Sequence, residues 1–162
     1  MQPSKLPGLI ADLELVRSNL RRVARNHEEV IASVGSEPEF FLNSAASVVL
    51  QDFYNTVEKS FEQIAVEIDG SLPSGDAWHY QLLQRMSVAI PGRRPAFIDQ
   101  ELAHTLHEYL RFRHLFRNIY GFDLDWERIE PLLVELPPVL ESFLSSVDAF
   151  LLFLNSLLEA ET

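Results

Sequence analysis

Apolar residues recur at intervals of three and four along most of the chain, the spacing that places side chains on one face of an α-helix. Five such stretches predict helices near residues 9–34, 37–68, 76–89, 99–119 and 126–159. Four of these helices are long and the one near 76–89 is short. We therefore expect an all-α fold, an up-and-down four-helix bundle with one additional short helix.

Capping and breaking residues stand between these stretches. Ser36 followed three residues later by Glu39 has the pattern of a capping box, which predicts the start of the second helix. Pro137 and Pro138 lie inside the last stretch and predict a kink, because a proline removes a backbone hydrogen bond and crowds the preceding turn. Three aspartates are the predicted caps of the later helices: Asp76, Asp99 and Asp125.

Length and composition indicate one folded domain over residues 1–162, with residues 1–8 expected to be a flexible tail. The chain has no cysteine, which excludes disulfides and thiolate chemistry. The leucine-rich stretch 132–158 is interrupted by prolines and acidic residues, and no basic residues followed by an apolar run begin the chain. We therefore expect a cytoplasmic protein with no membrane role.

Charge is distributed unevenly. The net charge of −11 argues against binding nucleic acid over a broadly basic surface. Residues 85–117, however, contain six arginines and only three acidic residues. Positive charge is thus concentrated in one segment, and it consists of arginine, the residue suited to directional contacts with phosphate or carboxylate.

The segment Arg113 to Gly121 has the densest chemistry in the chain. On a helix, Arg113, Arg117 and Tyr120 share a face, because positions i, i+4 and i+7 lie within about 40° of one another. The apolar line of the same helix also runs through Arg113, so this side chain points toward the packed side. Two interpretations remain open: Arg113 binds a phosphate, or it forms an internal ion pair. The candidate acidic partners lie on the second predicted helix: Asp52, Glu58 and Glu62.

Two further groups of residues allow two readings each. Arg93 and Arg94 stand between two prolines in a stiff basic loop, and they either face a ligand or serve the structure. His104, His107 and Glu108 have the i, i+3, i+4 spacing of metal ligands, but no matching Glu-x-x-His occurs on another helix. A polar helix face is the preferred reading of that group. We expect neither a metal nor another cofactor.

The pattern Arg113-His114-x-x-x-Asn118-x-Tyr120 resembles the motif of the HEPN superfamily, in particular of the HepT-like ribonuclease toxins, which have Arg, a polar residue, three variable residues, His, one variable residue and Tyr. The stretches Gly75-x-x-Trp78-His79-x-x-Leu82-Leu83 and Tyr120-Gly121-x-x-Leu124-Asp125 are also similar to HepT-like sequences. The resemblance covers roughly residues 48–130.

The resemblance implies a metal-independent endoribonuclease that acts as a homodimer on RNA. Arg113 would contact the scissile phosphate, with Arg117, Arg93 and Arg94 as further phosphate-binding residues. The implied partner is a minimal nucleotidyltransferase antitoxin, which in HepT systems adenylylates the motif tyrosine, here Tyr120.

The sequence departs from the motif at Asn118, which stands where the family has histidine. An amide cannot exchange a proton as an imidazole does, and general acid–base help contributes about 10²–10⁴-fold in rate. His114 keeps an imidazole in the motif, about 100° from Arg113 on a regular helix. Three function classes stay open: a toxin ribonuclease that is active or weakened, an inactive HEPN bundle that binds RNA, a nucleotide or a protein, and an unrelated helical adaptor that dimerises through its last helix.

Overall fold

The computed structural model describes residues 4–162, which fold into helices joined by loops. The long helices are α1 (Leu6–Ser33), α2 (Glu39–Ile64), α4 (Gln100–Arg117) and α5 (Trp126–Ala160). The short helix α3 (Trp78–Met86) lies between α2 and α4, a π-helical turn η1 (Ala65–Asp69) follows α2, and a 3-10 turn η2 (Gly121–Asp123) precedes α5. Within residues 4–162 there is no β-strand, only an isolated bridge between Ile90 and Arg94.

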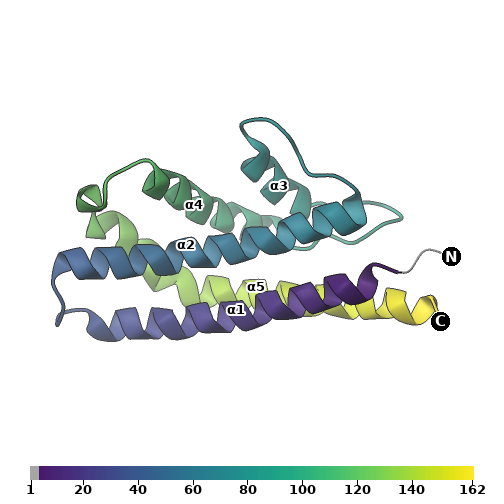
Figure 1. Cartoon of the computed structure of the whole chain (residues 1–162), viewed down its shortest axis with the longest axis horizontal. Helices are drawn as coiled ribbons and strands as arrows, with labels where there is room; N and C mark the ends of the chain where they lie inside the picture. Colours follow the sequence, from purple (N-terminus) through teal and green to yellow (C-terminus); the bar gives the residue numbers. More distant parts are fainter. Residues whose placement is uncertain (1–3) are drawn as a thin grey trace.

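The predicted all-α bundle is confirmed. Figure 1 shows α1, α2, α4 and α5 running alternately in opposite directions, with α3 standing beside α2 and α4 on the connection between them. The helix α1 packs on α2 and α5, whereas α4 contacts α2, α3 and α5. The cavity described below is formed where α3 and the end of α4 meet.

The predicted helix boundaries agree with the structure to within a few residues. The largest difference at an N-terminus is at α1, which begins at Leu6 and includes Pro7 in its first turn, where a missing N–H costs nothing. Part of the predicted tail is therefore helical, and residues 1–3 lie outside the described residues. The second helix ends at Ile64, and its predicted last turn is the π-helical η1.

The apolar stripes of the long helices form one core. In α5 the stripe includes Ile129, Leu133, Phe143 and Leu154, all buried, and the stripe of α1 packs against it. His27 lies on the α1 stripe, and its Nε2 is 2.6 Å from the carbonyl oxygen of Leu133 on α5. Because the α5 stripe is buried within the chain, it does not provide the dimerising face that an adaptor of the third class would need.

Two of the four predicted caps are confirmed and two are wrong. The carboxylates of Asp99 and Asp125 accept hydrogen bonds from the backbone N–H groups of Leu102 and Glu127, at 2.7 Å and 3.0 Å. Ser36 does not cap α2, because its hydroxyl donates to the Ser33 carbonyl at the end of α1. Asp76 does not cap α3 either: the residue before that helix is Ala77, and no side chain caps it.

The helix α5 continues through Pro131, Pro137 and Pro138. Figure 1 shows its first part running obliquely to the rest, in keeping with the predicted kink. Among the described residues, α5 alone is long and apolar enough to cross a membrane. The prolines and acidic residues of α5 therefore do not by themselves exclude a span, whereas its apolar stripe packs in the bundle core.

Candidate functional site

A cavity of about 730 Å³ lies between α3 and the C-terminal end of α4. It brings together most of the motif residues that the sequence singled out. Its α4 side is lined by Leu110, Arg111, Arg113, His114, Leu115, Arg117 and Asn118, and its α3 side by residues 75–80. Arg111, His114, Arg117 and Asn118 are exposed at this cavity, whereas Arg113 is only 3% exposed and lies deepest among the charged residues.

Arg113 forms an internal ion pair while it lines the cavity. Its Nη2 lies 3.0 Å from Oε2 of Glu58, one of the three acidic partners predicted from the sequence, and its Nη1 donates to Oδ1 of Asn55 at 2.9 Å. The guanidinium also stacks over the ring of Tyr54, 4.9 Å from its centroid. The internal ion pair is thus confirmed, and it does not remove the residue from the cavity.

The same ion pair includes a histidine that sequence reasoning left without a role. Nδ1 of His79, on α3, lies 2.9 Å from Oε2 of Glu58 and 3.0 Å from Nη2 of Arg113. The ring of Trp78 packs on the His79 ring, with centroids 3.7 Å apart. The sequence signal was the Trp78-His79 pair in the HepT-like stretch. Its meaning depends on contacts with α2 and α4, which spacing along α3 does not reveal.

Burial shifts the pKa of two groups around this ion pair. Burial is the main cause that raises the pKa of the Tyr54 phenol, and the negative charge of Glu58 adds to it. Burial also raises the pKa of Glu62, with Glu58 again the next cause. The Tyr54 hydroxyl has no hydrogen-bond partner among the described residues. The phenol under Arg113 therefore stays neutral, and Glu58 is the carboxylate that pairs with the guanidinium.

Asn118 ends α4 and its side chain turns back on the helix. Its Nδ2 donates to the carbonyl oxygen of His114 at 2.7 Å. The amide therefore donates a hydrogen bond to one of the carbonyl groups that have no backbone partner at a helix end. Nothing in this contact supplies acid–base chemistry, and the two imidazoles that line the cavity are His79 and His114.

Arg93 and Arg94 do not line this cavity. Arg94 is buried and forms a bidentate pair with Asp69, Nε to Oδ1 at 2.7 Å and Nη2 to Oδ2 at 3.0 Å. Its remaining N–H groups donate to the carbonyl oxygens of Arg85, Val88 and Pro95. Nη1 of Arg93 donates to the carbonyls of Ile68 and Asp69 at the end of η1. Both arginines hold the α2–η1 end in place. All five N–H groups of Arg94 have protein acceptors, which favours its structural reading. Arg93 is exposed and, among the described residues, donates only through Nη1, so its phosphate-binding role stays a prediction.

Tyr120 lies just beyond α4 and is 72% exposed. It precedes η2, in the short connection between α4 and α5. Its phenol is therefore accessible to a partner protein from the end of the bundle where Arg117 and Asn118 are also exposed.

The histidines upstream in α4 border a different cavity. His104 and His107 line a space of about 470 Å³ with α3, and the His107 ring packs on Tyr80 with centroids 4.6 Å apart. Within residues 4–162, no group of three His, Asp or Glu side chains is placed to hold a metal ion. The polar-face reading of His104, His107 and Glu108 is the one that agrees with these contacts.

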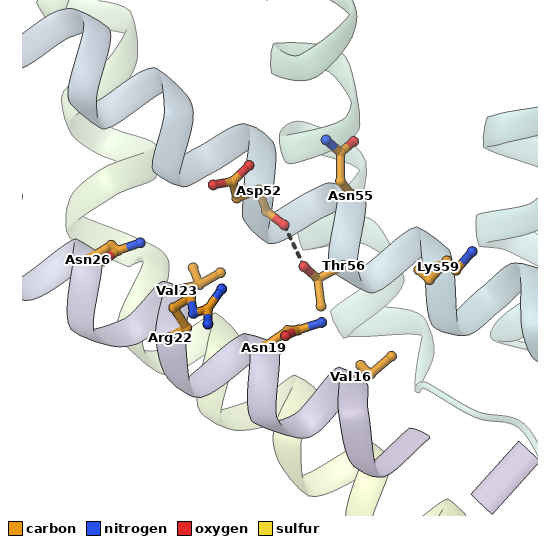
Figure 2. A pocket seen from close by; sticks show the side chains of 9 residues that line it. All are labelled: Val16, Asn19, Arg22, Val23, Asn26, Asp52, Asn55, Thr56 and Lys59. Carbon is orange, nitrogen blue, oxygen red and sulfur yellow. Dashed lines mark hydrogen bonds between the residues drawn. The ribbon is translucent and has the colours of Figure 1, made fainter. Parts of the chain in front are cut away.

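A polar groove of about 370 Å³ runs between α1 and α2 (Figure 2). Figure 2 shows Asn19 and Arg22 on the α1 wall and Asp52 and Thr56 on the α2 wall, with Thr56 donating to the Asp52 carbonyl. Asn55 lines this groove too, but its side chain points away from α1 and accepts the hydrogen bond from Arg113. The groove contains none of the site residues predicted from the sequence.

Comparison with known proteins confirms the resemblance to the HepT-like family and covers more of the chain. A family model described as HepT-like protein matches residues 45–154, which run from α2 through most of α5 and include the whole α3–α4 cavity. No curated protein and no solved structure matches the chain. Since the family model covers more than half of its length, the chain belongs to the HepT-like protein family.

Proposed function

We propose that this chain is a HepT-like toxin that acts on RNA, with the scissile phosphate held in the α3–α4 cavity and cleaved without a metal ion. The observation that carries the proposal is the gathering of Arg113, Arg117, His114 and His79 around one cavity in a HepT-like chain. Arginine forks match phosphate oxygens, and imidazoles transfer protons near neutral pH.

The hydrogen bonds of Arg113 leave it able to contact a phosphate. A guanidinium has five N–H donors. Arg94 uses all five on protein acceptors, whereas among the described residues Arg113 meets only Asn55, Glu58 and His79. Glu58 offsets the charge of Arg113, so the attraction for RNA comes mainly from Arg117 and Arg111 at the rim.

The proposal includes a partner that controls the toxin. A minimal nucleotidyltransferase antitoxin would transfer an adenylyl group to the exposed Tyr120, next to the end of α4 that carries the motif. A homodimer in the cytoplasm completes the proposal. Its interface is a face other than the apolar stripe of α5, which packs inside the bundle.

A second candidate is an inactive HEPN bundle that binds RNA and does not cleave it. Asn118 favours this candidate, because its amide bonds the His114 carbonyl and has no proton to exchange near neutral pH. Both candidates need RNA in the same cavity, and they differ only in turnover.

Binding and cleavage of RNA by purified variants test the two candidates together. Arg117→Ala should weaken RNA binding and lower the salt dependence by about one phosphate contact. Arg128→Ala, which removes an exposed arginine from α5 outside the cavity, is the charge-matched control and should bind as the wild type does. Equal RNA affinities of the two variants would show that RNA does not bind in the α3–α4 cavity.

Cleavage is then measured for the wild type and for Asn118→His. We expect slow cleavage by the wild type and faster cleavage by Asn118→His, with an upper limit of about 10²–10⁴-fold from added acid–base catalysis. Binding without cleavage in both proteins would establish the second candidate. Absence of both binding and cleavage would overturn the proposed function.

A further inference from the structure

We propose that His79 is the proton acceptor of this site and takes the catalytic place that Asn118 leaves without an imidazole. The inference rests on the proposed function, because it assigns a residue to RNA cleavage in the α3–α4 cavity. It goes beyond the motif, since His79 lies on α3, whereas the motif residues lie on α4 and just after its C-terminal end.

Three polar atoms form a nearly equilateral triangle at the base of the cavity. Nδ1 of His79 is 2.9 Å from Oε2 of Glu58, Nη2 of Arg113 is 3.0 Å from the same oxygen, and the two nitrogens are 3.0 Å apart. The side chains of Glu58 and Arg113 are 8% and 4% exposed, so water screens these contacts little.

The triangle selects one tautomer of His79. A proton on Nδ1 gives Glu58 a second hydrogen bond, in addition to that from Arg113. Without this proton, Nδ1 could accept from Nη2 of Arg113 at 3.0 Å, but its lone pair would lie 2.9 Å from a carboxylate oxygen, which is repulsive in a buried place; with the proton, both nitrogens donate to Glu58. The neutral ring therefore carries its proton on Nδ1 and leaves Nε2 as an acceptor, the arrangement in which a carboxylate orients a histidine base.

The ring is held in place and still reaches the cavity. Trp78 packs on one face of the imidazole, and the His79 side chain is 30% exposed and lines the cavity beside Arg113. Nε2 forms no hydrogen bond with residues 4–162. A ribose hydroxyl on an RNA whose phosphate meets Arg113 can therefore approach Nε2 from the cavity.

The other candidates for this role lack one of these features. His114 lines the cavity, but within the described residues no carboxylate lies at hydrogen-bond distance from its ring. Its backbone carbonyl accepts the Asn118 amide, which fixes the helix end and not the imidazole. Asn118 has no titratable proton near neutral pH.

The reaction balances without any added reagent. The RNA 2′-oxygen attacks the adjacent phosphorus, forming the O2′–P bond, while its proton moves to Nε2 of His79. The P–O5′ bond breaks, and the 5′-oxygen takes a proton from water at the open side of the cavity. His79 returns its proton to the resulting hydroxide. The products are a 2′,3′-cyclic phosphate and a 5′-hydroxyl, with Arg113 holding the phosphate oxygens throughout.

The test is His79→Asn, because the amide Nδ2 of asparagine can occupy the position of Nδ1 and still donate to Glu58. This variant keeps the orienting hydrogen bond and removes Nε2 together with the ring that packs on Trp78. We expect unchanged RNA affinity and only a small change of the urea midpoint from the lost packing, with cleavage slower by about 10²–10⁴-fold. His104→Asn, a change of the same type on an exposed histidine outside the cavity, is the control and should cleave as the wild type does.

The outcomes separate the inference from the proposed function. Wild-type cleavage that persists in His79→Asn and disappears in His114→Ala would assign the base to His114 and overturn the inference, while the function stands. Cleavage by Asn118→His alone, unaffected by His79→Asn in that background, would also overturn the inference. No binding and no cleavage by any variant would instead refute the proposed function. A substrate with 2′-deoxyribose at the cleavage position must not be cleaved by any of these proteins, because it lacks the attacking 2′-oxygen.

Discussion

Two arginines illustrate how the same side chain serves structure or function according to its contacts. Arg94 and Arg113 are both buried and both paired with a carboxylate. Arg94 directs all five N–H groups to protein acceptors away from the cavity. Arg113 has an incomplete set of partners and lines the cavity. Burial and charge are alike in the two residues, so the number of unmet donors is what distinguishes a structural arginine from one that can bind a phosphate.

The structural role of Arg94 predicts a large loss of stability when its partner changes. Asp69→Asn keeps the size of the side chain but leaves the buried guanidinium without its counter-charge. We expect the free energy of unfolding to fall by about 3–5 kcal/mol, the usual cost of breaking one side of a buried ion pair. Urea denaturation measures this change.

The matched control is Asp148→Asn, which changes the partner of Arg17 in an exposed pair at 2.9 Å. An exposed pair contributes about 0–1 kcal/mol, so this variant should unfold close to the wild-type midpoint. A small loss for Asp69→Asn, comparable to that of Asp148→Asn, would show that Arg94 is not a structural residue and would reopen its role in RNA binding.

Part of this site was predictable from the sequence because it depends on the helical period of single helices. The 3.6-residue period placed Arg113 on the packed side of its helix. It also limited the candidate acidic partners to three residues, and Glu58 is the one that pairs with Arg113. The pairing of His79 with both residues required knowing how α3 lies against α2 and α4. The 25 residues from Gly75 to Asp99 do not encode that arrangement in their spacing. The sequence therefore identifies His79 as a residue of the HepT-like stretch but does not indicate its chemical role.

At the scale of the helices, the predicted N-caps show when a capping residue in the sequence forms a cap in the structure. Ser36 and Asp76 have the residue type of a cap, but the chain around each takes another course. Ser36 bonds the end of α1, and α3 begins one residue later than a cap at Asp76 would require. Asp99 and Asp125 are confirmed because both also have the extended backbone of an N-cap and a backbone N–H within reach.

This difference gives a prediction for α4, the helix that carries the motif. Asp99→Ala removes the acceptor for the Leu102 N–H and should lower the free energy of unfolding by about 0.5–2 kcal/mol. Asp76→Ala removes no cap and should change it by less than about 0.5 kcal/mol. Thermal unfolding of the two variants side by side measures both. Equal losses would mean that the sequence pattern, and not the hydrogen bond, determines the cap energy.

At the scale of the whole molecule, the four long helices act as a support for one end of α4. The apolar stripes were predictable because each stripe follows from the residue spacing within a single helix. Which helices pair, and where α3 rests, depend on contacts across the bundle. As a result, the cavity at the α3–α4 junction followed from the structure, whereas the bundle itself followed from the sequence.

The antitoxin hypothesis makes the last prediction, because only some tyrosines of the folded protein are accessible to a modifying enzyme. The chain has four tyrosines. Tyr54 and Tyr109 are buried, and burial raises the pKa of both phenols, so neither is a usable acceptor in the folded state. Tyr80 is 39% exposed and its hydroxyl accepts a hydrogen bond from Gln84, whereas Tyr120 is 72% exposed at the end of α4.

We therefore expect co-expression with the cognate nucleotidyltransferase to add adenylyl mass to the wild type and to Tyr80→Phe, but not to Tyr120→Phe. Intact-protein mass spectrometry measures the addition, and fragmentation locates it. The modified wild type should also lose RNA binding, because a phosphate next to Asn118 repels the RNA backbone from Arg117 and covers the rim of the cavity. If Tyr120→Phe gains the same mass, the assignment of the acceptor is wrong. If modified protein binds RNA as tightly as unmodified protein, the nucleotidyltransferase does not act by blocking this cavity.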